Sequence, residues 1–176
     1  MNKQLLSKTG LILAVILFIA FIIVVNGNFK SARVDLTEDK LYTLSEGTLN
    51  ILSSLQQPIT LRFYYSEQVA QALPSLKAYA QRVQELLMEY QRASDGMIQV
   101  KIINPKPFTD HEQRAKQYGL QSIPIEGEPD PLFFGVAGTN ILDGLERIRF
   151  FQPEMEDVLE YDLTRMVYQL SDVERK

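Results

Sequence analysis

The segments ITLRFYY (Ile59–Tyr65) and MIQVKII (Met97–Ile103) give the two clearest strand signals in the chain. Both are dense in the β-branched and aromatic residues that favour strands. Between them, apolar residues from Pro74 onward recur at the spacing of one helical face, and Asp95-Gly96 ends this helix. The sequence therefore predicts a strand–helix–strand unit, long enough for a right-handed parallel crossover.

The elements on either side of this unit are read in the same way. Before it, Ser45 is placed to cap a short helix that Gln57-Pro58 ends. After it, we expect a helix, a stiff loop and two antiparallel strands joined at Asp143-Gly144: Glu112–Tyr118, Leu120–Pro131, Leu132–Gly138 and Leu145–Phe151. Gln152-Pro153 opens a last helical stretch, whose buried face runs from Val158 to Leu170. This order predicts an α/β fold with a mixed sheet and helices on both faces.

A long apolar run, Gly10–Val25, comes before all of these elements, and no charged residue lies between Lys8 and Lys30. A helix needs roughly 20 residues to cross a bilayer, so the run predicts a single transmembrane helix. The alternative is a cleaved signal peptide, but no Ala-x-Ala site follows Val25. We favour an uncleaved anchor. The short basic leading segment predicts that the N-terminus is cytoplasmic and that the rest of the chain lies outside.

Composition excludes several classes of function. The 176 residues carry a formal net charge of −4, which argues against a nucleic-acid partner. The chain has no cysteine and one histidine, His111, so disulfides, thiol chemistry and the usual zinc sites are not expected. Gly135-Val136-Ala137-Gly138 lacks the lysine and hydroxyl of a phosphate-binding loop, and we interpret it as glycine in an edge strand beside a bulge. We expect no catalytic residue, metal or cofactor.

The element order, together with Tyr118–Ile125, resembles a thioredoxin-like fold. In that fold the proline before the third strand is commonly cis, so the resemblance makes Pro124 a structural cis-proline candidate. Thioredoxins carry reactive cysteines in the loop after the first strand. The matching loop, Ser66–Leu73, has none, so the redox activity is not carried over.

A second resemblance extends over most of the chain. The segments Val34–Ser45, Ala80–Tyr90, Tyr118–Pro124 and Glu160–Arg165 resemble the pattern of the GldG-like family of ABC transporter auxiliary proteins. The resemblance implies an inner-membrane protein that acts beside a separate permease and a separate ATPase. Family members are usually longer, with a second extracytoplasmic domain and a closing transmembrane helix. This sequence stops before both, which is expected of a truncated or a short member.

These observations predict four parts: a tip and anchor (1–29), a juxtamembrane segment with the capped helix (30–57), a thioredoxin-like domain (58–171) and a polar tail (172–176). The juxtamembrane segment supplies the candidate partner-binding residues Asp35, Leu36, Thr37, Tyr42, Thr43, Leu44 and Ser45. For Ser45 and Tyr42, capping and local packing are equally good explanations. Glu160–Arg165 is a second candidate interaction face, although packing of Tyr161 on Arg165 within one helix explains the same spacing.

The function expected is that of a non-enzymatic, membrane-anchored auxiliary subunit of an ABC-2-type transport system in a bacterial inner membrane. Its partners would be an ABC permease, a separate ATPase subunit and the lipid bilayer around the N-terminal helix, with no nucleic acid. The alternative is a stand-alone ligand- or peptide-binding module of the envelope, which a ligand bound in a cleft lined by Tyr64, Tyr65 and Phe134 would favour.

Overall fold

The computed structural model describes residues 15–18, 44–70 and 73–171. Residues 15–18, inside the apolar run, are helical. The rest of the expected anchor, the segment 30–43 and the polar tail lie outside the described residues. In the part of the chain that is described, no helix is long and apolar enough to cross a membrane. The chain divides into units 1–41 and 42–176, and the fold described below belongs to the second unit.

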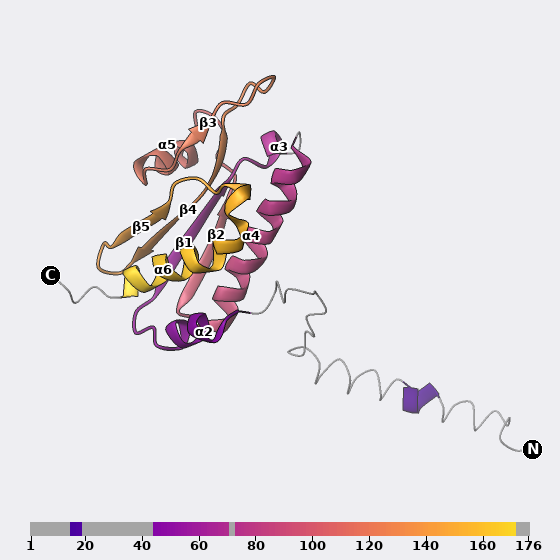
Figure 1. Ribbon diagram of the computed structural model, residues 1–176, viewed down its shortest axis with the longest axis vertical. Helices are drawn as coiled ribbons and strands as arrows, with labels where there is room; N and C mark the ends of the chain where they lie inside the picture. Colours follow the sequence, from indigo (N-terminus) through magenta and orange to yellow (C-terminus); the bar gives the residue numbers. More distant parts are fainter. Residues whose placement is uncertain (1–14, 19–43, 71–72, 172–176) are drawn as a thin grey trace, which may run out of the picture. The chain divides into compact units, whose positions relative to one another are not determined.

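The folded unit is a mixed α/β structure built on one mixed sheet, as the sequence predicts (Figure 1). Its elements are α2 (Glu46–Ser53), β1 (Ile59–Tyr65), α3 (Glu67–Ala70), α4 (Pro74–Ala93), β2 (Ile98–Ile103), α5 (Asp110–Gln117), β3 (Ser122–Ile123), β4 (Leu132–Asn140), β5 (Leu145–Ile148), the 3-10 helix η2 (Pro153–Val158) and α6 (Leu159–Ser171).

The sheet has the order β2-β1-β4-β3, and β5 also pairs with β4. β1 and β2 are parallel neighbours, with Ile59 opposite Ile98, and α4 connects them. β4 is antiparallel to β1, and both β3 and β5 are antiparallel to β4. The predicted parallel crossover and the predicted antiparallel pair are both confirmed.

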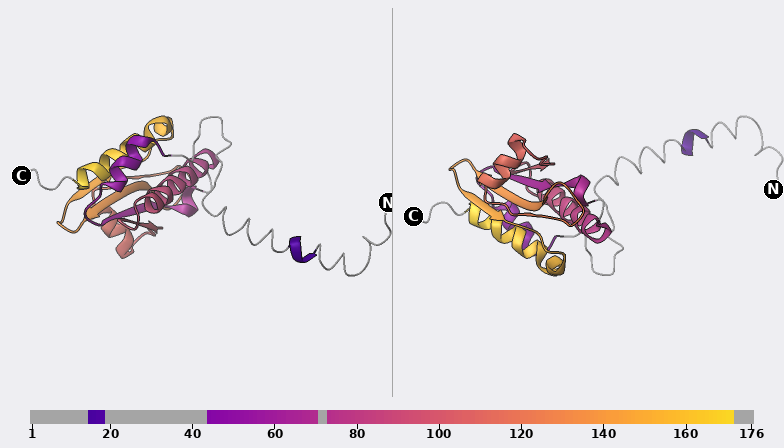
Figure 2. Two further views of the ribbon diagram at one scale, coloured as in Figure 1. Left: turned by 90° about the horizontal axis from the view of Figure 1, so that it is seen from below. Right: turned by 90° about the horizontal axis from the view of Figure 1, so that it is seen from above.

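The two faces of the sheet bury different cores. Leu61 and Phe63 of β1 point into the main core, which α2, α4 and α6 complete. The next residue, Tyr64, points to the opposite face and packs in a smaller cluster with Ala115 of α5. Figure 2 shows α5 on the side of the sheet opposite α2 and α6. This separation follows from the alternation of side chains along a strand.

The helix α2, which we grouped with the juxtamembrane segment, shares the main core of the domain. Leu44, Leu52 and Leu55 all belong to that core and are almost fully buried. Burial of a leucine side chain stabilises the fold by about 1.5–3 kcal/mol. α2 is therefore anchored to the domain by packing, in addition to its N-cap.

The outer edge of β2 is occupied by side chains of α4. The N–H of Ile98 donates to Ser94 Oγ at 3.0 Å, and the N–H of Val100 donates to Gln91 Oε1 at 2.7 Å. An edge strand normally presents such N–H groups to solvent or to another strand. Two polar side chains near the end of α4 satisfy them instead.

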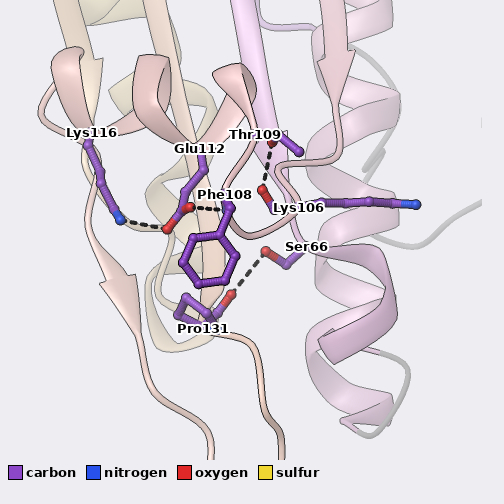
Figure 3. Close-up of polar contacts among 7 residues, drawn as sticks. All are labelled: Ser66, Lys106, Phe108, Thr109, Glu112, Lys116 and Pro131. Atoms are coloured by element: carbon purple, nitrogen blue, oxygen red, sulfur yellow. Dashed lines mark hydrogen bonds and ion pairs between the residues drawn. The ribbon is translucent and has the colours of Figure 1, made fainter.

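The loop between β2 and α5 holds a strained residue. Phe108 is fully exposed and has a φ of 59°, a left-handed conformation that is rare for a bulky side chain. Its N–H donates to Glu112 Oε2 at 2.8 Å, and Glu112 also accepts from Lys116 (Figure 3). Thr109 Oγ1 donates to the carbonyl of Lys106, closing the turn on the other side. The loop is thus fixed by hydrogen bonds rather than by packing of its aromatic ring.

Some expectations about loops and glycines are wrong. The loop Ser66–Leu73 contains the short helix α3, and the loop Leu120–Pro131 contains β3. β4 is a central strand rather than an edge strand, and Gly135 has a packing role there. A Cβ on Gly135 would lie 2.7 Å from the carbonyl oxygen of Ile148. Glycine is therefore needed for the close approach of the neighbouring backbone.

Pro124 is not a cis-proline. No cis peptide bond occurs in residues 44–70 or 73–171, so the bond between Ile123 and Pro124 is trans. β3 pairs with β4 only through Ser122 and Ile123, and the chain leaves the ladder before Pro124. Nothing in that pairing opposes the trans form, which X–Pro bonds favour by about 0.5–1 kcal/mol.

Candidate functional site: a groove between α2 and α6

A groove with a volume of about 620 Å³ lies between the first turns of α2 and the length of α6. Its lining comes from one face of each helix and from the end of η2: Ser45, Gly47, Thr48, Ile51, Asp157, Glu160, Tyr161, Thr164, Arg165 and Tyr168. The volume is within the range of about 300–1,000 Å³ typical of binding pockets. It includes Ser45 and the Glu160–Arg165 face, two of the candidates from the sequence.

The floor of the groove is a helix cap made between two helices. Ser45 caps α2, and its Oγ accepts from the N–H of Thr48 at 3.3 Å. In a capping box, a Glu three residues after the cap would accept from the N–H of the capping residue. Here that position is Thr48, and Glu160 of α6 supplies the carboxylate: its Oε1 accepts from Ser45 N at 2.8 Å and from Thr48 Oγ1 at 2.6 Å. The floor therefore ties α2 to α6.

The hydroxyl groups below Glu160 continue this network. Since Thr48 donates its proton to Glu160, Thr164 donates to Thr48 across the 2.9 Å between their Oγ1 atoms. The hydroxyl of Tyr90 of α4 then has two acceptors for its single proton, Thr164 Oγ1 at 2.5 Å and the carbonyl oxygen of Glu160 at 2.9 Å. Three helices thus share one chain of hydrogen bonds, which fixes the side chains of the floor.

The network also sets the protonation of its members. Partial burial by itself would raise the pKa of Glu160, but hydrogen bonds from Thr48 and Ser45 outweigh it, and the pKa lies below the ordinary value of 4.5. Glu160 is consequently a carboxylate at neutral pH, beside the N-termini of both α2 and α6, where a negative charge is favourable. Burial raises the pKa of Tyr90 far above its ordinary range, so Tyr90 stays protonated.

The rim of the groove has a different character. Tyr161 and Tyr168 are 66% and 49% exposed, and Arg165 between them is also exposed. These residues recur at i, i+4 and i+7, so they form one stripe along α6. Ile51 and Gly47 lie on the α2 side, where Gly47 has no side chain to fill the space. The groove has a rigid polar floor and an exposed aromatic rim.

The predicted partner-binding residues divide into three groups. Asp35, Leu36, Thr37, Tyr42 and Thr43 lie outside the described residues. Leu44 is buried in the main core, so its side chain is not available to a partner. Ser45 both caps α2 and lines the groove, so its capping role is confirmed.

The cleft suggested for the alternative function does not form. Tyr64 and Phe134 are each at most 1% exposed, and they pack in different cores on opposite faces of the sheet. Because Tyr65 lies next to Tyr64 in β1, it points to the face of Phe134. Alternation along the strand therefore prevents these three rings from lining one site.

Sequence reasoning missed Thr48, Ile51 and Tyr168. Thr48 could have been found, because Ser-x-x-Thr has the spacing of a capping box without its carboxylate. A missing acidic partner indicates that another element supplies one. Ile51 and Tyr168 have no such signal, since each looks like an ordinary position on an amphipathic helix.

The structure describes no group of three or more His, Cys, Asp or Glu residues placed to hold a metal ion. The fold and the groove define a mixed α/β domain with a groove between two of its helices. The chain belongs to the family described as "Domain of unknown function (DUF7088)", whose model matches residues 38–139, from the segment before α2 into β4. The α6 side of the groove lies beyond the matched residues. No curated protein and no solved structure matches the chain.

Proposed function

We propose that the chain is a non-enzymatic, membrane-anchored auxiliary subunit of an ABC-2-type transport system in a bacterial inner membrane. In this proposal the folded unit is a thioredoxin-like extracytoplasmic domain, and it contacts the permease or the cargo through the α2–α6 groove. The separate ATPase subunit would provide the energy, and the apolar run Gly10–Val25 would be the anchor.

The observation that carries the proposal is the rim of the groove. Tyr and Arg are enriched among the residues that dominate binding energy at protein interfaces. Tyr161, Arg165 and Tyr168 present such side chains in one stripe, above a floor that is already fixed by hydrogen bonds. A preorganised surface loses less conformational entropy on binding, which favours a protein contact.

The state of the floor favours a protein partner over a small ligand. A ligand site usually offers a few convergent polar groups that are free to bind. Here the hydroxyl groups of Thr48 and Thr164 and the carboxylate of Glu160 are bound to one another. A small polar ligand would have to break these bonds, whereas an apolar or aromatic side chain of a partner could rest on the rim without doing so.

The fold adds support of a more general kind. The parallel crossover β1–α4–β2, α5 on the opposite face, and the sequence β4–β5–α6 keep the element order on which the thioredoxin-like resemblance rests. The second resemblance, to the GldG-like family, supplies the partners of the proposal. Fold alone would not define a function.

The test is a mild-detergent pull-down of the tagged full-length chain from its native membranes, with mass spectrometry of the bound proteins. We expect a multi-span permease and its ATPase to be recovered. In the double variant Tyr161→Ala/Tyr168→Ala, recovery should fall more than about tenfold, since loss of a dominant interface residue exceeds about 1–2 kcal/mol. Phe108→Ala removes an exposed aromatic ring outside the groove and should leave recovery unchanged.

Two results would count against the proposal. Recovery of the chain alone, from cells that express a permease and an ATPase of this type, would contradict the proposed role in transport. If the wild type and the double variant recover the permease equally well, the groove is not the contact surface. Capture of a small molecule by the wild-type chain, lost in the double variant, would favour the ligand-binding alternative.

A further inference from the structure

The face of the sheet that carries α5 has a row of basic side chains. The ladder places Lys101 of β2 beside Arg62 of β1, Arg62 beside Ala137 of β4, and Ala137 beside Arg147 of β5. Directly paired residues point to the same side of a sheet, so all four lie on one face. We name the three charged residues, Arg62, Lys101 and Arg147, the basic sheet face.

The surroundings of this row do not neutralise it. Next to it on the same face, the ladder places Thr60, Gln99, Thr139 and Leu145, none of which is acidic. Among the described residues, no carboxylate forms an ion pair with a residue of the basic sheet face. The nearest helix, α5, carries Asp110 and Glu112 as well as Arg114 and Lys116, so its own charges cancel, and the excess positive charge comes from the basic sheet face itself. A net positive surface therefore lies on a chain whose overall charge is −4.

Arg62 is held in a defined orientation at the centre of the row. Its Nη1 donates to Thr139 Oγ1 at 2.8 Å, and its guanidinium carbon lies 5.7 Å from the centre of the Tyr118 ring. Burial raises the pKa of Tyr64, and the positive charges of Arg62 and Arg114 partly oppose this rise. Arg62 and Arg114 are thus close enough to act on the same group, and their charges add.

Arg147 has a structural role that must be weighed against binding. A Cβ on Gly119 would lie 2.9 Å from Arg147 Nε, so the guanidinium lies against the turn that ends α5. A positive charge there is favourable to the helix dipole. The same explanation does not apply to Lys101, which is exposed on the edge strand, or to Arg62, which lies mid-strand. Helix capping therefore explains only one of the three charges.

We propose that the basic sheet face binds an acidic segment of a partner protein. The guanidinium group matches a carboxylate through two parallel hydrogen bonds, and Arg62 is already oriented for such a contact. Arg62 is only partly exposed, whereas Lys101 and Arg147 on either side are exposed, and the buried Ala137 adds no bulk. A single carboxylate side chain can reach Arg62 between these two residues, whereas a flat lipid surface would meet Lys101 and Arg147 first. This inference does not depend on the proposed function.

The test uses the full-length chain in a mild neutral detergent and a fluorescent peptide of alternating Glu and Gly as the probe. We expect saturable binding that weakens as salt is raised, because the contact is between exposed charges. In the triple variant Arg62→Gln/Lys101→Gln/Arg147→Gln, the affinity should fall at least tenfold. The matched double Lys77→Gln/Arg92→Gln removes two positive charges from exposed positions of α4 and should change the affinity less than twofold.

A second variant keeps the experiment decisive if loss of Arg62 unfolds the domain. Lys101→Gln/Arg147→Gln leaves Arg62 and its bonds in place, and its affinity should fall about threefold or more. Equal losses in Lys101→Gln/Arg147→Gln and in the matched double Lys77→Gln/Arg92→Gln would overturn the proposal, because the peptide would then respond only to net charge. The proposal also fails if the peptide does not bind while micelles doped with an anionic phospholipid do, since the surface would then recognise lipid.

Discussion

Glu160→Gln tests whether one carboxylate holds α2 and α6 together. The amide oxygen of glutamine can still accept from Ser45 N and Thr48 Oγ1, so the variant keeps the shape and removes the charge. Hydrogen bonds to a charged group contribute about 1.5–3 kcal/mol each, against about 0.5–1.5 for neutral ones. The favourable contact with two helix N-termini adds a few tenths of a kcal/mol at each. Because Glu160 is partly exposed, we expect a loss of about 1–2 kcal/mol in the free energy of unfolding.

The effect should depend on pH in a defined direction. The pKa of Glu160 is lowered in the folded state, so its stabilisation is fully present above the ordinary value of 4.5 and is lost as the pH falls through the lower folded value. The difference between wild type and Glu160→Gln should therefore be largest near neutral pH. It should shrink as the pH falls below about 4.

The assay is urea unfolding of the full-length chain in a mild detergent, followed by circular dichroism at pH 7 and at pH 3.5. With a slope of about 2 kcal/mol per M, the midpoint at pH 7 should fall by about 0.5–1 M. Glu46→Gln removes an exposed charge from the first turn of α2 and should change stability by about 0.3–1 kcal/mol only. An unchanged midpoint in Glu160→Gln, or a loss of equal size at both pH values, would refute the role assigned to the carboxylate.

Three further substitutions test other parts of the fold by the same assay. Gly135→Ala should destabilise the domain by about 2–4 kcal/mol, because the new Cβ would meet the backbone of β5 and force it to move; an effect below 1 kcal/mol would contradict the close approach. Tyr90→Phe removes the contacts of the buried hydroxyl with Thr164 and with the carbonyl of Glu160 and should lose about 1–2 kcal/mol; an unchanged stability would contradict a role for this hydroxyl in the network. Phe108→Gly should raise the free energy of unfolding by about 0.5–1 kcal/mol, because glycine adopts a left-handed conformation without strain, while Phe108→Ala should leave it unchanged. A larger gain in Phe108→Ala than in Phe108→Gly would be inconsistent with the observed φ.

The sequence predicts those features that depend on local pattern. The strand-forming residues of Ile59–Tyr65 and Met97–Ile103, with the apolar face of α4 between them, identify the parallel crossover. Asp143-Gly144 identifies the connection of β4 to β5. The strand β3 could not be predicted, because two residues carry no period. Its existence depends on the backbone of β4, which offers free bonding groups beside it.

The groove could be predicted only in part, for a similar reason. Ser45 and the Glu160–Arg165 face are visible as a cap and a charged helical face, but their proximity is a tertiary property. The carboxylate that completes the cap of α2 is separated from it by more than a hundred residues. The need for glycine at position 135 could not be predicted either, because it arises from the close approach of the backbone of another strand, β5.

The two hydrogen bonds from Ser94 and Gln91 to the edge of β2 limit how this protein can self-associate. A strand arriving at that edge would displace both side chains and so gain little, since it would exchange existing bonds for similar ones. Addition of a strand at the β2 edge is therefore disfavoured in the folded state.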